Sequence, residues 1–323
     1  MTGGSIVMRY HESAREFARA YVITMRPYLM FVSGITGIAG LTFAHDLPLW
    51  RVLAIGLASY LSYGFGQALT DCFQIDTDSI SSPYRPLTRG IVSKQSVLAA
   101  SIAGLTGCIS LLSVFNPINA ALGLAAGIGL AVYTPFKRRW WAGPFSNAWI
   151  VVVLFLMAAL AGRAEGPDLR SPQCLLALSV VFFGYANFVL AGYFKDVAAD
   201  RLTGYDTVLV RYGRNVSAWI SDLLAVITIL AAAAIALRAP AVSPAALCFL
   251  GLAIVASVFA QLRLHQVRTD AMAYRAISPV VYSYLLLLSG VAAIQKPDWS
   301  APLALFCAAF AIVMKFRPER SQI

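Results

Sequence analysis

Long apolar segments recur along the whole sequence. About 20 apolar residues cross the hydrocarbon core of a bilayer as a helix, and the backbone of such a segment must satisfy its own hydrogen bonds there. The sequence therefore predicts an all-α polytopic membrane protein. The segments lie at 22–44, 52–71, 95–115, 117–134, 146–162, 172–193, 216–237, 243–263, 275–295 and 300–316.

The charged residues support this class and predict an orientation. They make up 12% of the chain, against about 25% in soluble domains. With the N-terminus placed in the cytoplasm, 20 of the 25 Lys and Arg residues fall on the cytoplasmic side, as the positive-inside rule requires. We expect a multi-pass protein of a bacterial inner membrane, with Arg9 to Arg19 in an interfacial helix. Topology and anionic lipid account for the net charge of +10, so no nucleic-acid partner is expected.

Two acidic clusters follow apolar segments that are four spans apart. Asp71, Asp76 and Asp78 follow the second segment, and Asp196 and Asp200 follow the sixth. Basic residues and a glycine follow each cluster, and both clusters fall on the predicted cytoplasmic side. This pattern indicates a single domain, 1–323, built from two four-helix halves at about 20–115 and 116–215, with further helices at 216–316.

Helical spacing brings carboxylates together within each cluster. If the second helix continues past Asp71, then Asp71, Gln74 and Asp78 share one face and Asp76 points away from it. Asp196 and Asp200 are spaced i, i+4 on the sixth helix. Like charges at this spacing repel unless a cation lies between them.

Oxygen ligands of this kind suit Mg²⁺ together with a phosphorylated substrate. The three histidines are isolated, so the sequence does not favour zinc. Basic side chains near the clusters are candidates to hold the remaining phosphate oxygens, although such residues also commonly anchor helix ends. They are Arg85, Lys137, Arg138, Arg139 and Lys195. We interpret the other acids Asp206, Asp222 and Asp270 as helix caps or solvated residues.

At these positions the sequence resembles the UbiA superfamily of intramembrane prenyltransferases. The stretch Thr70 to Asp78, followed by Pro83-Tyr84-Arg85-Pro86-Leu87 and Gly90, is similar to the first motif of that family, NDxxDxxxD and P-x-R-P-L/I. Tyr193, Lys195, Asp196, Asp200 and Arg201 match the second motif, DxxxD in a Y-x-K-D context. Arg26-Pro27 and the stretch Tyr133 to Arg138 also match. The correspondence covers about residues 20 to 215 by motif.

The resemblance implies a ring of about nine or ten helices around a central cavity, with the active site at its cytoplasmic mouth. It implies that Asp71, Asp78, Asp196 and Asp200 bind two Mg²⁺ ions, which bridge to an isoprenyl diphosphate, with Asp76 as a further metal ligand. The implied activity ionises the donor, transfers its prenyl group to a lipophilic or aromatic acceptor and releases diphosphate. The implied substrate-binding residues are Thr70, Gln74, Arg85, Tyr133, Lys137, Arg138 and Lys195.

The sequence departs from the family pattern at several points. Thr70 stands where the family has Asn, and Gln74 stands where it has the second Asp of the first motif. The chain also has ten apolar segments where nine helices are typical. Two other functions therefore stay open: a terpene cyclase that uses the same site without an external acceptor, and a cation-coupled transporter. Carboxylates gathered at one membrane face, away from the midplane, argue against transport.

Overall fold

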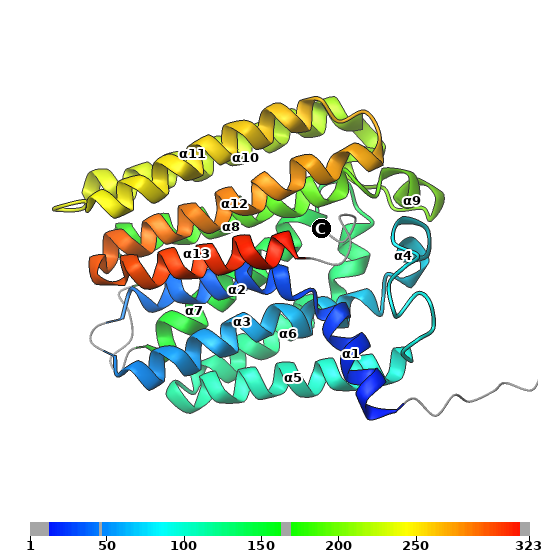
Figure 1. Cartoon of the computed structure of the whole chain (residues 1–323), viewed down its shortest axis with the longest axis horizontal. Helices are drawn as coiled ribbons and strands as arrows, with labels where there is room; N and C mark the ends of the chain where they lie inside the picture. Colours follow the sequence, from blue (N-terminus) through cyan, green and yellow to red (C-terminus); the bar gives the residue numbers. More distant parts are fainter. Residues whose placement is uncertain (1–12, 45–46, 163–168, 317–323) are drawn as a thin grey trace, which may run out of the picture.

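The computed structural model describes residues 13–44, 47–162 and 169–316, and all regular structure in these ranges is helical. Figure 1 shows the long helices lying side by side, with the short helices α4 and α9 gathered at one end of the bundle. The long helices are α2 (Pro27–Leu41), α3 (Leu49–Asp71), α5 (Lys94–Phe115), α6 (Ile118–Lys137), α7 (Gly143–Ala161), α8 (Pro172–Tyr193), α10 (Val208–Arg238), α11 (Pro244–His265), α12 (Asp270–Gln295) and α13 (Ser300–Lys315). The short ones are α1 (Ala14–Met25), α4 (Ile75–Ser81), α9 (Val197–Leu202) and the 3₁₀ turn η1 (Pro297–Trp299).

The described residues contain nine helices that are long and apolar enough to cross a membrane, or ten when α1 and α2 count as one span. Each predicted apolar segment coincides with one of the long helices, so the chain is an integral, multi-pass membrane protein.

The predicted segment 22–44 is not one straight helix. α1 and α2 meet at Arg26 and are bent by 58°. Arg26 has a φ of 55°, in the left-handed region that ends a helix, and Pro27 then begins α2 at a position where a missing N–H costs little. The interfacial helix predicted near Arg9 to Arg19 corresponds in part to α1, whose N-terminus is capped reciprocally by Ser13 and Glu16. Arg9 lies outside the described residues.

Neighbouring helices close a ring. Along the chain, α2 packs on α3, α3 on α5, α5 on α6, α6 on α7, α7 on α8, α8 on α10, α10 on α11 and α11 on α12, and α12 returns to α2. Most residues of α2 and α12 are buried, whereas fewer than three in ten residues in the apolar stretches of α5, α6, α11 and α13 are. Apolar side chains on these outer helices suit contact with lipid.

The helices α2–α5 and α6–α9 each comprise three long helices and one short one. The short helix in each set contains part of an acidic cluster. The division of the chain into two four-helix halves that arose by duplication stays a prediction.

Candidate active site

The first acidic cluster lies on a break between two helices. α3 ends at Asp71, a turn follows at Cys72 to Gln74, and α4 begins at Ile75. The expectation of one continuous helix through this cluster is therefore wrong, because the turn changes the direction of the chain. The turn nevertheless leaves Asp71, Gln74 and Asp78 on the wall of one cavity.

The second acidic cluster has the same design. α8 ends at Tyr193, and Asp196 is the N-cap residue of the short helix α9, which contains Asp200. The sequence predicted both carboxylates on one face of a continuous sixth helix. That prediction is wrong, because the chain breaks between α8 and α9. Asp196 makes no side-chain capping bond to α9, and its side chain lies on the cavity wall.

These residues enclose a polar cavity of about 700 Å³, open solvent at its mouth included. Three carboxylates and four basic groups share its wall with amide, hydroxyl and aromatic side chains. The polar and aromatic lining residues are Arg26, Tyr63, Gln67, Thr70, Asp71, Gln74, Asp78, Arg85, Tyr133, Lys137, Asn147, Tyr185, Phe188, Tyr193, Lys195 and Asp196.

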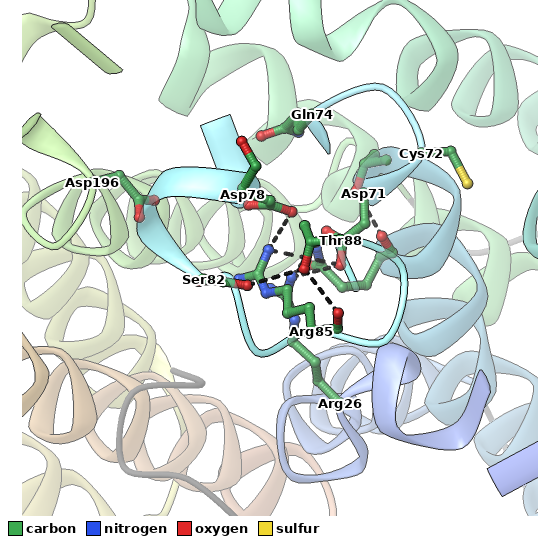
Figure 2. Close-up of polar contacts among 12 residues, drawn as sticks. Arg26, Asp71, Cys72, Gln74, Asp78, Ser82, Arg85, Thr88 and Asp196 are labelled. Carbon is green, nitrogen blue, oxygen red and sulfur yellow. Dashed lines mark hydrogen bonds and ion pairs between the residues drawn. The ribbon is translucent and has the colours of Figure 1, made fainter. Parts of the chain in front are cut away.

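Two arginines hold the carboxylates of the first cluster. Arg26 donates to both oxygens of Asp71, at 2.9 and 2.7 Å, and Gln67 donates to the same carboxylate at 2.7 Å. Arg85 forms an ion pair with Asp78, and its Nη1 also lies 3.9 Å from Asp71 Oδ2. In Figure 2 the two guanidinium groups lie between the two carboxylates. Arg26 and Arg85 thus bring a fixed positive charge to a buried site.

The carboxylates of Asp78 and Asp196 differ in how their surroundings affect ionisation. Burial raises the pKa of Asp78, and Arg85 opposes this effect. Burial also disfavours ionisation of Asp196, but Lys195, Lys137 and Arg85 outweigh it and lower its pKa. Lys195 Nζ lies 3.4 Å from Asp196 Oδ1. Asp196 is therefore ionised at neutral pH.

Lys137 connects the two acidic clusters. Its Nζ donates to Gln74 Oε1 at 3.1 Å and lies 3.5 Å from Asp200 Oδ1. Asp200 is fully buried and does not line the cavity, whereas Lys137, its ion-pair partner, does. Burial raises the pKa of Asp200 to about 7, although Lys137 opposes the rise.

Besides Asp200, three candidate residues lie outside the cavity, namely Asp76, Arg138 and Arg139. Asp76 is exposed on α4, and its carboxylate pairs at 3.0 Å with Arg138, which is also exposed. Tyr205 donates to the other Asp76 oxygen at 3.3 Å, and the Arg138 guanidinium lies over the Tyr205 ring. These contacts join α4 to the loop after α9. Asp76 and Arg138 thus pair with each other in a structural contact and do not line the cavity.

A second, apolar cavity adjoins the first. It has about 810 Å³ of open space and lies between α3, α5, α6 and α7. Its wall includes Leu105, Ile109, Leu130, Ile150 and Leu154. Five residues line both cavities, so the charged space and the apolar space lie side by side; they are Tyr63, Gln67, Thr70, Asn147 and Tyr185.

Several lining residues were not among the predicted site residues. Gln67 lies four residues before Asp71, so helical spacing could have revealed it. Arg26 carried a signal only as part of the Arg-Pro pair. Tyr193, whose hydroxyl bonds that of Tyr133 at 2.8 Å, also belonged to a motif. Tyr185 drew attention only as one of several aromatic residues near the clusters, and Asn147 gave no sequence signal, since only the packing of α7 brings it to the cavity.

The donor set fits a hard cation only in part. Within the described ranges, no three His, Cys, Asp or Glu side chains are grouped closely enough to hold a metal ion without other ligands. Asp71, Asp78 and Asp196 nonetheless open onto one cavity, and neither carboxylate oxygen of the buried Asp200 has a hydrogen-bond partner. Oxygen donors of this kind suit Mg²⁺ when phosphate oxygens complete its coordination.

A charged cavity beside an apolar one suits a substrate with one ionic and one lipophilic end. The sequence profile of the UbiA prenyltransferase family matches residues 30–284, and the chain belongs to this family. The chain is therefore an enzyme, a prenyltransferase, and the transporter alternative is set aside.

Two curated relatives are similar over much of the chain. Digeranylgeranylglyceryl phosphate synthase of Thermococcus kodakarensis is 27% identical over 217 residues, which are 66% of this chain and 76% of that protein. Chloroplastic chlorophyll synthase of Avena sativa is 27% identical over 170 residues, or 49% of this chain and 43% of that protein.

Two solved structures show the same fold. A UbiA homologue from Archaeoglobus fulgidus, bound to DMAPP and Mg²⁺, matches with a TM-score of 0.64 at 18% identity, over 85% of this chain and 99% of that one. An apo UbiA homologue from Aeropyrum pernix matches with a TM-score of 0.65 at 17% identity, over 88% of this chain and 96% of that one.

Proposed function

We propose that this prenyltransferase is Mg²⁺-dependent, ionises an isoprenyl diphosphate and transfers the prenyl group to a lipophilic acceptor. The observation that carries the proposal is that a charged cavity and an apolar cavity lie side by side and share five lining residues. A charged wall suits the diphosphate, and the apolar space between α3 and α7 suits the prenyl chain. The structure of the Archaeoglobus fulgidus homologue, bound to DMAPP and Mg²⁺, supports both ligands.

Basic side chains bind the diphosphate in this scheme. Arg85 and Lys195 line the cavity next to Asp78 and Asp196, and their charges offset the negative charge that grows on the leaving group. Arginine can hold two phosphate oxygens at once, which fixes the direction of the C–O bond that breaks.

Asp71, Asp78 and Asp196 would hold Mg²⁺ together with diphosphate oxygens, and Asp200 would contribute behind Lys137. Bound Mg²⁺ acts as a Lewis acid that neutralises charge on the leaving diphosphate. The aromatic rings of Tyr63 and Tyr185, which line both cavities, would stabilise an allylic cation formed beside them and help to exclude water from it.

The acceptor class rests on the relatives. The names of the two curated relatives point to lipophilic products, and a lipid acceptor would reach the apolar cavity from the bilayer. An aromatic acceptor and a cyclase that needs no acceptor remain alternatives. A cyclase differs in that it releases diphosphate from the donor alone.

We further propose that the cavity opens on the cytoplasmic side, because the basic loops cluster there. Lys94, Arg139, Arg211 and Arg268 belong to loops or helix ends at this end of the bundle, and cytoplasmic loops are enriched in such residues. A cysteine introduced at Ser79 on α4 tests this orientation. In a background with the exposed Cys248 replaced by alanine, a membrane-impermeant maleimide is expected to label Ser79→Cys only after cells are permeabilised, and labelling in intact cells would contradict this orientation.

The function is tested by measuring diphosphate release from geranyl, farnesyl and geranylgeranyl diphosphate, with and without Mg²⁺ and with and without extracted membrane lipid. Mg²⁺-dependent release that requires lipid is the expected result. Release without any acceptor, with a terpene product, would indicate the cyclase. A protein that releases no diphosphate under any of these conditions would contradict the proposal.

A further inference from the structure

Gln74 is neutral where the family pattern has an aspartate, so the first acidic cluster of this chain has one negative charge fewer. Its side chain is buried at the cavity wall, and its amide oxygen accepts a hydrogen bond from Lys137. An amide is a neutral and weaker ligand for Mg²⁺ than a carboxylate. The side chain at position 74 therefore contacts the ammonium group of Lys137, a cation that is part of the protein.

Lys137 is held at this position from several sides. Gln74 Oε1 lies 3.1 Å away and Asp200 Oδ1 3.5 Å away. The rings of Tyr193 and Tyr205 lie with their centroids 5.4 and 5.1 Å from the ammonium nitrogen. Ring faces attract a cation, and the carboxylate compensates its charge, so the ammonium group is fixed where it faces the cavity.

The charges around the cavity balance in pairs. Asp71 pairs with Arg26, Asp78 with Arg85, Asp196 with Lys195 and Asp200 with Lys137. Buried charge is costly unless it is compensated. A carboxylate at position 74 would add one negative charge beside Lys137 that none of these four basic groups matches. With glutamine there, the four carboxylates are already matched.

We infer that this enzyme holds a single divalent cation with its donor diphosphate and that the Lys137 ammonium takes the place of a second one. Asp78 and Asp196, which line the cavity from the two acidic clusters, would share the one ion. Lys137 would bind the diphosphate oxygens that a second ion would otherwise neutralise, and Gln74 keeps that lysine free of a competing carboxylate on its cavity side. This inference rests on the proposed function.

The test counts bound metal directly. Mn²⁺ replaces Mg²⁺, and its stoichiometry is measured by electron paramagnetic resonance on the full-length protein in nanodiscs, saturated with geranylgeranyl S-thiolodiphosphate, which resists ionisation. One ion per chain is expected for the unchanged protein and two for Gln74→Asp. Ser79→Asp, which adds a carboxylate to the exposed face of the same short helix, is the matched control and is expected to bind one.

Two ions in the unchanged protein would overturn the inference and leave the proposed function standing. No ion bound in the presence of the analogue would overturn both. One ion in a folded Gln74→Asp variant would also overturn the inference, because the added charge would then have needed no metal. If Gln74→Asp does not fold, Gln74→Glu places the same charge at the same position, and the count in the unchanged protein still decides.

Discussion

The carboxylate of Asp270 accepts a hydrogen bond of 2.9 Å from the backbone N–H of Ala198. This bond ties the start of α12 to the first turn of α9, the short helix that contains Asp200. Asp270 also pairs with Arg214, at the start of α10. Asp270 therefore caps α9 from a distant part of the sequence and leaves the side chain of Asp196 available to the cavity.

Asp270→Ala is expected to raise the Mg²⁺ concentration needed for half-maximal activity and to lower kcat, because α9 loses its cap. A lost cap costs about 1 kcal/mol, or roughly fivefold. Asp270→Asn keeps an oxygen for the Ala198 N–H and is expected to retain more activity. Asp206→Ala, which removes an exposed ion pair with Arg211, is the matched control. Equal effects of Asp270→Ala and Asp206→Ala on the Mg²⁺ requirement would contradict the positioning role.

Asp196→Asn is expected to lower turnover by two orders of magnitude or more, since electrostatic groups of this kind typically contribute about 10²–10³ in rate. Asp71→Asn is expected to do the same, because Arg26 would lose its charged partner on the cavity wall. Steady-state diphosphate release measures both effects. Unchanged thermal unfolding of each variant would separate lost chemistry from lost folding, and a normal rate in both variants would contradict the proposed site.

Asp76→Asn, in contrast, is expected to keep at least half of the activity. Asp76 is exposed and bonds to Arg138 and Tyr205 outside the cavity, and exposed ion pairs contribute little. The same diphosphate-release measurement tests this. A loss as large as that of Asp196→Asn would return Asp76 to the set of metal ligands.

Gly127→Phe is expected to shift the donor preference toward shorter chains. Gly127 lines the apolar cavity, and a Cβ added there would have no neighbouring heavy atom within 4 Å. A phenyl ring would occupy room that a long prenyl chain needs, so kcat/KM for geranylgeranyl diphosphate is expected to fall about tenfold or more relative to geranyl diphosphate, since even one methylene contact is worth about tenfold. Gly107→Phe places the same ring on the exposed surface of α5 and is expected to leave the ratio unchanged. An unchanged ratio in Gly127→Phe would place the prenyl chain elsewhere.

Hydropathy predicted the spanning helices well because length and apolar content alone determine them. The breaks near Arg26 and Cys72 were not predicted. A left-handed φ at an arginine has no regular sequence signal, and the turn after α3 depends on tertiary contacts. The outward position of Asp76 was predicted from helical spacing. That prediction assumed that the second helix continues past Asp71, whereas α3 ends there and Asp76 lies on the separate helix α4.

The acidic residues of the candidate site were predictable because carboxylates are rare in such an apolar chain. Their partners were not. Lys137 and Asp200 are separated by 63 residues, as are Lys137 and Gln74, and only the packing of the ring brings the three together. The role of Gln74 thus depends on a contact that one sequence cannot reveal.

The central claim, Mg²⁺-dependent transfer of a prenyl group from its diphosphate, is tested most directly by following a radiolabelled prenyl donor into extracted lipid. Purified protein in nanodiscs is incubated with labelled geranylgeranyl diphosphate and membrane lipid, with Mg²⁺ or with a chelator. The account predicts a labelled lipid product that requires Mg²⁺ and disappears in Asp196→Asn. Labelled lipid formed equally in the chelator, or equally by Asp196→Asn, would contradict it.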